Sequence, residues 1–452
     1  MKSFVALLAL GASVVPALGG MVTRQSQSKG KSTPVEVKGN AFFAGDKRFY
    51  VRGVAYQPGG AADAKDPLLD LKGLERDIKN FKSLGINTIR VYTIDNAKNH
   101  DKAMQMLDDA GIYLALDANT PKYSLNRETQ ATLHRSYNDV YLQSVFATVD
   151  AFADYTNLLL FFSGNEVINA KNNTGAATYI KAVTRDMKRY ISNTKSRPIP
   201  VGYSAADVAE NIEQQALFFN CGTDDERSDF FAFNDYSWCD PSSFKEAGWD
   251  KKVETYKDYS KPIFLSEFGC ITNKREWKEI NSLYGDDMTS VYSGGLAYEY
   301  TEEPNGYGLV SLENGEIKTN DDFDTLKKQY AAVKTPSGSG GFKENGKASE
   351  CPPADDEWEV TSTILPEIPS KALDMMKKGA GTAPGLDGDG SHFAGETSAS
   401  EATPGSGAAT RVPNGQAAAG GDGSGAAAGV DVPLRFVAML GASVLFGVVL
   451  LF

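Results

Sequence analysis

Histidine and cysteine are scarce in this chain of 452 residues, which has three histidines and four cysteines. No two cysteines form a CxxC pair, so the usual ligands and spacing of a zinc site are missing. Asp and Glu outnumber Lys and Arg by 58 to 46, and the net charge of −12 argues against nucleic acid as a partner, because little would neutralise phosphates. No GxGxxG segment follows the first strand-like run, which disfavours a nucleotide-binding fold. We therefore expect neither a metal nor a cofactor.

Both ends of the chain carry apolar segments that direct a protein to the cell surface. Residues 1–19 begin with a lysine and an apolar stretch and end in small residues, which predicts a secretory signal peptide. Residues 430–452 contain the uncharged run FVAMLGASVLFGVVLLF, and small residues around Ser424 precede it. This order is typical of a GPI-attachment signal, with the lipid added at Ser424. A single C-terminal membrane span is the alternative, but the run is short for one and no basic residues follow it.

We therefore expect a protein held by a lipid anchor at the extracellular face of the plasma membrane and in the cell wall. In that oxidising compartment Cys221, Cys239, Cys270 and Cys351 would form two disulfides, for which three pairings are possible. Asn172 begins one N-glycosylation sequon. The segment 378–429 is rich in Gly, Ala, Ser and Thr and has too little apolar surface to fold, so it is predicted to be a flexible stalk.

Between residues 40 and 335, short apolar runs alternate with longer segments of helical periodicity. The eight runs are FYVRGVAY (49–56), INTIRVY (86–92), IYLALDA (112–118), LLLFFSGNE (158–166), IPVGYS (199–204), FFAFNDYSW (230–238), PIFLSEFG (262–269) and GLAYEY (295–300). Residues 74–85 place Leu74, Ile78 and Phe81 on one helical face and end at Gly85. Eight strands alternating with helices predict an α/β fold, a closed parallel (β/α)8 TIM barrel, and the length suits one.

Two of these runs end in glutamates, Glu166 in the fourth and Glu267 in the seventh. The ends of strands four and seven face each other across the mouth of a closed barrel, so the two carboxylates could flank a glycosidic bond. One would act as acid/base and the other as nucleophile of a retaining mechanism. The acid needs a raised pKa, which burial beside another carboxylate supplies. Asn165, just before the acid, could donate a hydrogen bond to a sugar 2-hydroxyl.

Gly164-Asn165-Glu166 and Ser266-Glu267-Phe268-Gly269 resemble the acid/base and nucleophile motifs of retaining (β/α)8 glycosidases. IRVYTIDNAKNHDKAM, VGYSAADVAEN, FFAFNDYSWC and SGGLAYEYTEE resemble one family in particular, glycoside hydrolase family 72, the fungal GPI-anchored β-1,3-glucanosyltransferases. The likeness runs from about residue 33 to Cys351, the predicted catalytic domain. It implies that Glu166 is the acid/base and Glu267 the nucleophile.

The resemblance also implies which residues line the sugar cleft, namely Tyr92, Asn165, Asp207, Tyr236 and Tyr298. Gln57, which closes the first run, is a further candidate of the same kind. The strand-end tyrosines as a group are predicted to face the cleft, because sugar rings pack on aromatic faces and phenols supply hydrogen bonds. They are Tyr92, Tyr203, Tyr236, Tyr298 and Tyr300.

For the cysteines the resemblance implies the pairs Cys239–Cys270 and Cys221–Cys351. A further disulfide of the family is replaced by Leu74 and Ala103, and with Cys351 the last cysteine, the family's cysteine-rich carbohydrate-binding module is absent. The activity implied is internal cleavage of β-1,3-glucan and transfer of the new reducing end to another glucan chain, by an enzyme expected to be a monomer. A glucan hydrolase and an inactive wall-anchored glucan-binding protein are the alternatives, and the presence of both glutamates disfavours the second.

Overall fold

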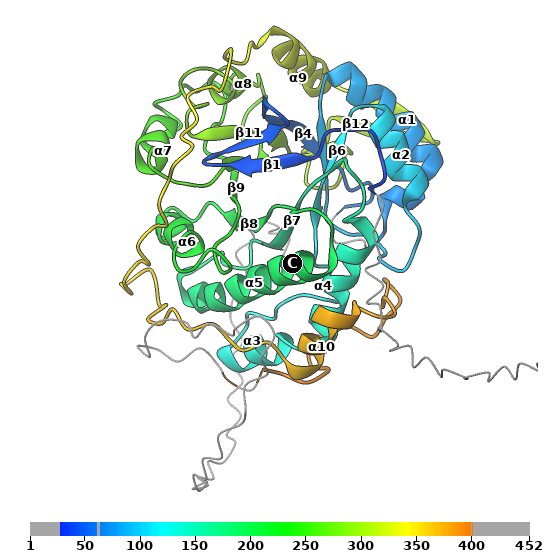
Figure 1. Ribbon diagram of the computed structural model, residues 1–452. Helices are drawn as coiled ribbons and strands as arrows, with labels where there is room; N and C mark the ends of the chain where they lie inside the picture. Colours follow the sequence, from blue (N-terminus) through cyan, green and yellow to red (C-terminus); the bar gives the residue numbers. More distant parts are fainter. Residues whose placement is uncertain (1–27, 61–63, 399, 401–452) are drawn as a thin grey trace, which may run out of the picture.

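The computed structural model describes residues 28–60, 64–398 and 400. Eight parallel strands close into a barrel, in the order β10-β11-β4-β5-β6-β7-β8-β9 (Figure 1). They are β4 (Val51–Ala55), β5 (Thr88–Val91), β6 (Tyr113–Asp117), β7 (Leu158–Asn165), β8 (Val201–Ala206), β9 (Phe231–Asp235), β10 (Ile263–Phe268) and β11 (Tyr292–Ala297). Each strand overlaps the run that predicts it, so the predicted (β/α)8 barrel is confirmed.

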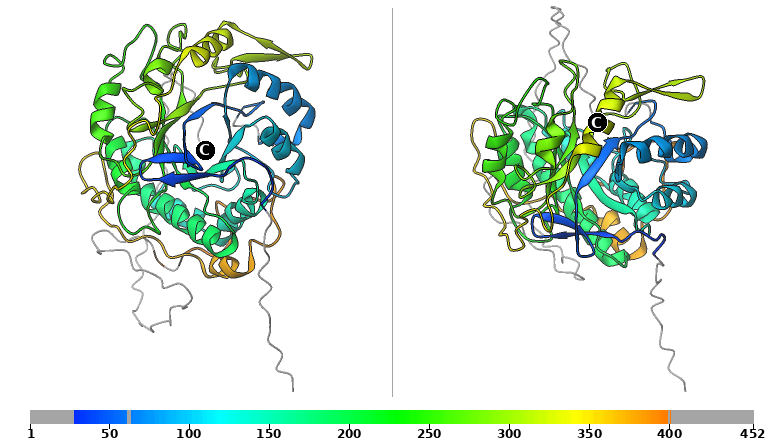
Figure 2. Two further views of the ribbon diagram at one scale, coloured as in Figure 1. Left: turned by 45° about the horizontal axis from the view of Figure 1, so that its top comes forward. Right: turned by 90° about the horizontal axis from the view of Figure 1, so that it is seen from above.

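Helices surround the barrel (Figure 2). The α-helices are α1 (Leu71–Leu84), α2 (Asp101–Asp109), α3 (Gln130–Ser136), α4 (Asp139–Phe152), α5 (Ala177–Thr194), α6 (Ile212–Phe219), α7 (Trp249–Tyr256), α8 (Glu279–Leu283), α9 (Asp321–Ala332) and α10 (Ser370–Lys378), and the short 3-10 helices are η1 (Pro67–Leu69) and η2 (Lys171–Ala176). The carboxylate of Asp70 caps α1 by accepting from the Gly73 amide. Gly85 ends this helix at φ 72°, the left-handed conformation that glycine adopts without a Cβ penalty.

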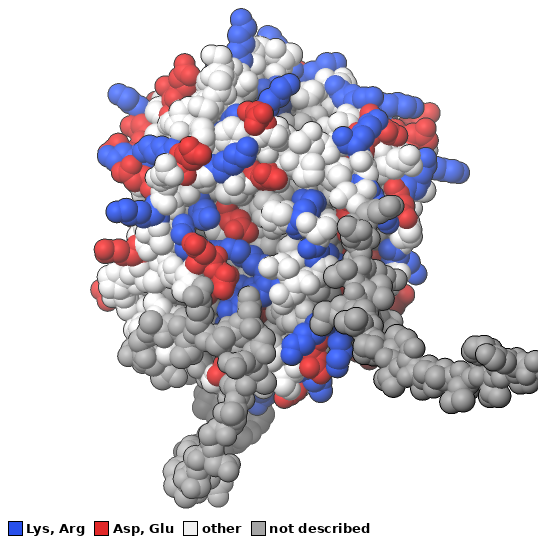
Figure 3. Space-filling model, viewed as in Figure 1, with Lys and Arg blue, Asp and Glu red and all other residues white. Residues whose placement is uncertain are grey.

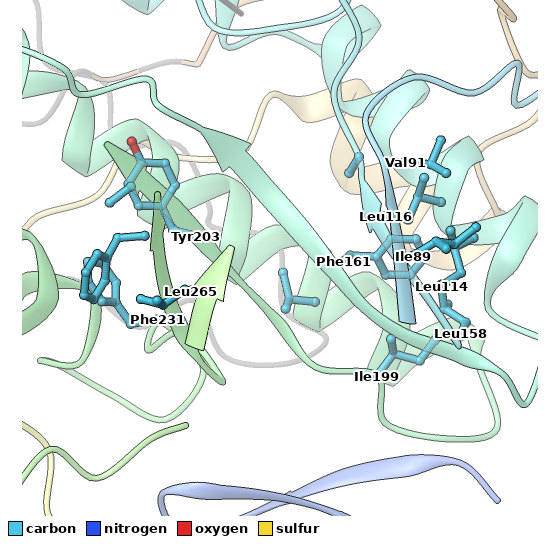
Figure 4. Packing of buried hydrophobic residues seen from close by; sticks show 14 of the residues in the cluster. Ile89, Val91, Leu114, Leu116, Leu158, Phe161, Ile199, Tyr203, Phe231 and Leu265 are labelled. Carbon is cyan, nitrogen blue, oxygen red and sulfur yellow. The ribbon is translucent and has the colours of Figure 1, made fainter. Parts of the chain in front are cut away.

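Alternation along the strands divides the apolar core into two layers. Outward-facing residues such as Ile89, Leu114 and Phe161 pack between the barrel and the helices (Figure 4). Their neighbours Ala115 and Phe162 belong to a separate cluster inside the barrel. Both layers are needed because a parallel sheet is covered on both faces.

A small antiparallel sheet closes the barrel at the N-terminal ends of its strands. It consists of β1 (Val35–Lys38), β2 (Ala41–Ala44) and β3 (Lys47–Phe49). Phe42 of β2 packs its ring against Phe230 and Phe264, with centroids 6.2 and 5.8 Å apart. The ribbon β12 (Val310–Glu313) and β13 (Glu316–Thr319) lies at the opposite end (Figure 2, right). On the face that carries β1, acidic and basic side chains are interspersed (Figure 3).

The folded unit continues well past Cys351, which corrects two expectations. The sequence predicts a catalytic domain that ends at Cys351 and a stalk that begins at 378, yet residues 352–398 lie against the barrel. Gln143 donates to the Ala380 carbonyl at 3.1 Å, and Asn138 and Thr397 form a β-bridge. A Gly- and Ala-rich chain has few bulky side chains to bury, but polar side chains of the barrel satisfy its backbone groups, which composition does not reveal. Residues 401–429 of the predicted stalk lie outside the described residues.

Both disulfide pairings implied by the resemblance, Cys221–Cys351 and Cys239–Cys270, are present and confirmed. Leu74 and Ala103 are buried in the apolar layer under the helices. Within residues 28–60, 64–398 and 400, no helix is long and apolar enough to cross a bilayer. The predicted signal peptide (1–19), the attachment residue Ser424 and the tail 430–452 all lie outside the described residues.

Candidate active site

Glu267 lies near the C-terminal end of β10, and three donors surround its carboxylate. The Tyr92 hydroxyl donates to Oε1 at 2.8 Å and the Tyr236 hydroxyl to Oε2 at 2.7 Å. Nη1 of Arg90 lies 3.3 Å from Oε1. The residue is 7% exposed. Because hydrogen bonds to a carboxylate stabilise its charged form, these three donors favour the anion, in opposition to burial.

Arg90 is a buried cation at the boundary between the apolar barrel interior and the cleft. Its Nε and Nη2 donate to both oxygens of Asp117, at 2.9 and 3.1 Å. The guanidinium lies over the rings of Phe162 and Tyr92, at 4.3 and 4.4 Å from their centroids. A bidentate pair between two such rings has little freedom to move, so the charge beside Glu267 is fixed in place.

Glu166 directly follows β7, in a backbone conformation that glycine prefers, with φ at 48°. The Glu166 amide donates to the Ser204 carbonyl at 2.9 Å, and the Arg127 guanidinium donates to the Glu166 carbonyl. Asn234 donates to its Oε1 at 2.8 Å. Left-handed backbone at a non-glycine residue costs free energy and persists where neighbours hold it, which is typical of functional sites.

A chain of polar side chains connects the strand ends behind the two glutamates. The Ser204 hydroxyl lies 2.7 Å from Oδ1 of Asn165 and 2.8 Å from the Ser266 hydroxyl. Ser266 donates to Oδ1 of Asn234 at 2.8 Å. These bonds use the Asn165 oxygen, while its Nδ2 donates to none of the described residues. That amide therefore remains available to a sugar hydroxyl.

The pKa values of both glutamates are raised. Burial raises the pKa of Glu267 to about 7, Arg90 opposes this rise, and the nearby Glu166 adds to it. Burial also raises the pKa of Glu166, against the hydrogen bond from Asn234. Interacting carboxylates titrate as a pair. Glu267 has three donors and Glu166 has one on its carboxylate, so hydrogen bonding assigns the charge to Glu267 and the shared proton to Glu166.

Both glutamates open into one cleft of about 390 Å³ at the C-terminal ends of the strands. It is lined by Tyr92, Thr93, Asp117, Asn119, Thr120, Pro121, Ser124, Leu125, Tyr141, Ser163, Asn165, Glu166, Val167, Asn169, Ala206, Tyr236, Glu267, Tyr298, Asn305 and Tyr307. Such a hollow, apolar for the most part with a few convergent polar groups, suits a ligand with apolar faces and hydroxyl edges. Within the described part of the chain, no three His, Cys, Asp or Glu side chains are grouped to hold a metal ion.

Three tyrosines form an aromatic corner on one side of Glu267. The rings of Tyr236, Tyr298 and Tyr307 meet edge to face, with centroids 5.2 to 6.3 Å apart. Arg275 holds this corner from behind, donating to the carbonyls of Tyr298 and Tyr307 at 2.9 and 2.8 Å. Rigid rings beside the carboxylate offer flat surfaces for sugar packing.

The structure brings four of the six predicted binding residues to the cleft, Tyr92, Asn165, Tyr236 and Tyr298. Gln57 and Asp207 do not line it. The buried Gln57 side chain accepts from the backbone amides of Tyr92 and Thr93 at 3.1 Å, so it acts on the cleft through these two lining residues. The Asp207 carboxylate is paired with Lys252 at 2.7 Å.

Two of the five strand-end tyrosines also point elsewhere. The hydroxyl of Tyr203 accepts from the Ile168 amide, and that of Tyr300 donates to Asp77 at 3.1 Å. Both side chains are fully buried in the layer under the helices. The expectation that these two face the cleft is therefore wrong, because strand-end position does not say to which side of the sheet a residue points.

Sequence reasoning missed several residues that build the site. Arg90 and Asn234 stand inside the motif segments IRVY and FFAFNDYSWC, and a charge within an apolar strand was the available signal for Arg90. Tyr307 and Arg275 lie on loops and carried no local signal. Asn172, the predicted glycosylation site, is exposed on η2.

Comparison with known proteins places this chain in one family. Residues 24–334 match the family model described as glucanosyltransferase. The chain is 57% identical over 384 residues to the 1,3-beta-glucanosyltransferase gel1 of Aspergillus fumigatus, covering 85% of this chain and 83% of that protein. It is 49% identical over 372 residues to the 1,3-beta-glucanosyltransferase GAS5 of Saccharomyces cerevisiae, and the match covers 81% of this chain and 76% of that protein. The chain belongs to the glucanosyltransferase family.

A solved structure shares the fold. It is a mutant of Saccharomyces cerevisiae Gas2p in complex with laminaritetraose and laminaripentaose, which matches with a TM-score of 0.70 and 36% sequence identity. The match covers 75% of this chain and 76% of that one. The family resemblance drawn from the motifs is thus confirmed over the barrel.

Proposed function

We propose that this protein is a retaining 1,3-β-glucanosyltransferase that cleaves β-1,3-glucan internally and transfers the new reducing end to the non-reducing end of another β-1,3-glucan, elongating cell-wall glucan. The observation that carries the proposal is the unequal pair of glutamates in one cleft. Glu267 is held by three donors that favour its anion, whereas the carboxylate of Glu166 has one. Family membership and the oligosaccharides bound to Gas2p support the substrate class.

In the first step, Glu267 attacks the anomeric carbon and forms a covalent ester while the glycosidic C–O bond breaks. Glu166 gives its proton to the departing oxygen, and the leaving chain departs as an alcohol. In the second step, a hydroxyl of the acceptor glucan attacks the same carbon and gives its proton to Glu166, now a base. Glu267 leaves as a carboxylate. Two inversions give net retention, and no cofactor enters either step.

Transfer and hydrolysis share the covalent intermediate, so the acceptor decides between them. The aromatic corner of Tyr236, Tyr298 and Tyr307 beside Glu267 supports transfer, since a sugar held near the anomeric carbon competes with water through its high effective concentration. Incubation with a reduced laminari-oligosaccharide followed by sizing tests this. Products longer than the substrate are expected, with the β configuration by NMR. Shorter products alone would identify a hydrolase, and binding without turnover a glucan-binding protein.

We also propose that the enzyme acts while tethered to the outer face of the plasma membrane, as a monomer glycosylated at Asn172. The sequence of the tail supports a GPI anchor at Ser424, and about 25 residues separate this position from Ser398, where the continuous described segment stops. Phosphatidylinositol-specific phospholipase C should release the protein from membranes. Retention in the detergent phase, with a peptide from 436–452 detected by mass spectrometry, would indicate a membrane span instead.

A further inference from the structure

The last described segment, residues 379–398, forms a C-terminal strap that lies across the outside of the barrel. It follows α10, and in Figure 1 this orange end of the described chain lies beside α3 and α4. Its contacts converge on the loop that follows β6. This loop, residues 119–125, forms one wall of the cleft through Asn119, Thr120, Pro121, Ser124 and Leu125.

The strap fits closely around Lys122 and Tyr123 of this loop. The Lys122 ammonium donates to the Gly388 carbonyl at 3.2 Å, and the Ser391 amide donates to the Lys122 carbonyl at 2.9 Å. Tyr123 is buried with its ring in the core. A Cβ on Gly388 would lie 2.0 Å from the Tyr123 hydroxyl oxygen, so only glycine fits there while Tyr123 keeps its place.

Tyr123 in turn fixes residues that face the cleft. Its backbone exchanges two hydrogen bonds with Thr120, of 3.0 and 3.1 Å, which close the turn around Pro121. His392 of the strap lies next to the loop as well, with Nε2 3.0 Å from the Ser124 hydroxyl. The strap is therefore in contact with the cleft wall itself.

A second line of contacts runs from the strap through the start of α4. Asn138 donates to the Ser391 carbonyl at 2.6 Å, and its side-chain oxygen caps the Tyr141 amide at 2.9 Å. The Tyr141 hydroxyl donates to Asn119, and both of these residues line the cleft. Two independent sets of contacts thus end on the same wall.

We infer that the strap positions the cleft wall 119–125 and thereby sets the affinity for the glucan units that lie along it. Gly388 is the central positioning residue, acting through Tyr123. The inference rests on the proposed function for the identity of the ligand. Neither Glu166 nor Glu267 is bonded to the strap within the described residues, so the effect falls on binding rather than on the chemical step.

The test is Gly388→Ala in the full-length protein. Its φ is not left-handed, so the substitution changes contacts without backbone strain. The Cβ displaces Tyr123 and the wall with it, and KM for a reduced laminari-oligosaccharide should rise about tenfold with kcat within about twofold of wild type. Tyr123→Phe removes the oxygen that the Cβ meets, so the double variant should regain most of the wild-type KM. Gly381→Ala is the control for strain in the strap: its φ is 75°, so the added Cβ strains the backbone, while the nearest side-chain atom lies 3.9 Å from that carbon. It should lower the melting temperature and leave KM at the wild-type value.

A second variant tests the inference in case Gly388→Ala misfolds. Lys122→Met alters an exposed side chain and removes its hydrogen bonds to the Leu386 and Gly388 carbonyls, so KM should rise in the same direction by a smaller factor. Wild-type KM in both variants, even with a lower melting temperature, would overturn the inference by showing that the strap only stabilises the fold. A wild-type protein that does not turn over laminari-oligosaccharides refutes the proposed function instead. In that case, calorimetric binding of laminaripentaose to the same variants tests whether the strap sets the affinity for glucan.

Discussion

At the N-terminal ends of the barrel strands the interior is filled with aromatic rings, whereas at the C-terminal ends it opens into a cleft that carries charged side chains and hydroxyls. Phe42 of the small sheet closes the first end against Phe230 and Phe264. Arg90 marks the boundary, with Phe162 on one side and Glu267 on the other. The first end gains stability from apolar burial, while the second holds groups whose burial opposes folding.

The contrast shows that the same eight strands serve two purposes, stability at their N-terminal ends and a reactive site at their C-terminal ends. Apolar packing at the closed end can hold the strands rigid, so the open end can keep two carboxylates close together and partly desolvated. The raised pKa values of both glutamates reflect the free energy that burying their charges costs. Substitutions at the two ends should therefore separate stability from activity.

The largest effect is expected from Glu267→Gln, which removes the proposed nucleophile and should lower kcat by more than about 10⁴-fold. Stability should not fall with it. The folded-state pKa of Glu267, about 7, lies above its ordinary value of 4.5, so the carboxylate opposes folding increasingly as pH rises from 4.5 to 7. The variant should thus melt at or above the wild-type temperature at pH 8, with the advantage shrinking toward pH 4.5. Melting curves and rate assays on the same samples measure the change in stability and the change in kcat. The variant Glu166→Gln should lower kcat by a smaller factor, about 10²–10⁴-fold.

At the closed end, Phe42→Ala should lower stability and leave activity unchanged. Loss of a ring packed against two others leaves a cavity and should lower the free energy of unfolding by about 3–5 kcal/mol. Denaturant titration measures this, while KM and kcat at 20 °C should stay near wild type for the folded fraction. A changed KM would mean that the two ends are coupled through the strands.

Tyr92→Phe sharpens the contrast at the open end. It removes a donor that favours the Glu267 anion, so the pKa of Glu267 rises further. Since turnover needs this group ionised, activity is lost as pH falls through its pKa, and the acidic limb of the kcat/KM profile should move to higher pH. A hydrogen bond to a charged group contributes about 1.5–3 kcal/mol, so the rate below the pKa should fall by about 10- to 160-fold. If the acidic limb of the variant stays at the wild-type pH, a group other than Glu267 produces it.

The smallest effect is expected from a tyrosine that only resembles a cleft residue. Tyr300→Phe removes a hydrogen bond to the buried Asp77 and should cost about 1 kcal/mol of stability, with KM unchanged. Tyr298→Phe, two residues earlier, changes a residue that lines the cleft and should raise KM. Oligosaccharide binding by calorimetry distinguishes them. Equal effects on KM would contradict the placement of Tyr300 outside the cleft.

The eight strand runs and both glutamates could be predicted from the sequence because each is a local signal. A continuous apolar run marks a strand buried on both faces, and a carboxylate at its end stands out. The strap could not be predicted in this way. Its residues are mostly small and polar, and what holds it, such as Asn138 and Gln143, lies more than 200 positions away in the chain.

The sequence by itself determined the barrel, its family and the two carboxylates, since apolar periodicity and motif residues are fixed by chain order. Only the tertiary structure decided which tyrosines reach the cleft, which donors surround each glutamate and that residues 352–398 pack against the barrel. Tyr298 lines the cleft and Tyr300 lies in the outer layer although both end the same run. The physical reason is that a hydrogen bond or a raised pKa depends on distance and burial among residues far apart in the chain, which no local pattern encodes.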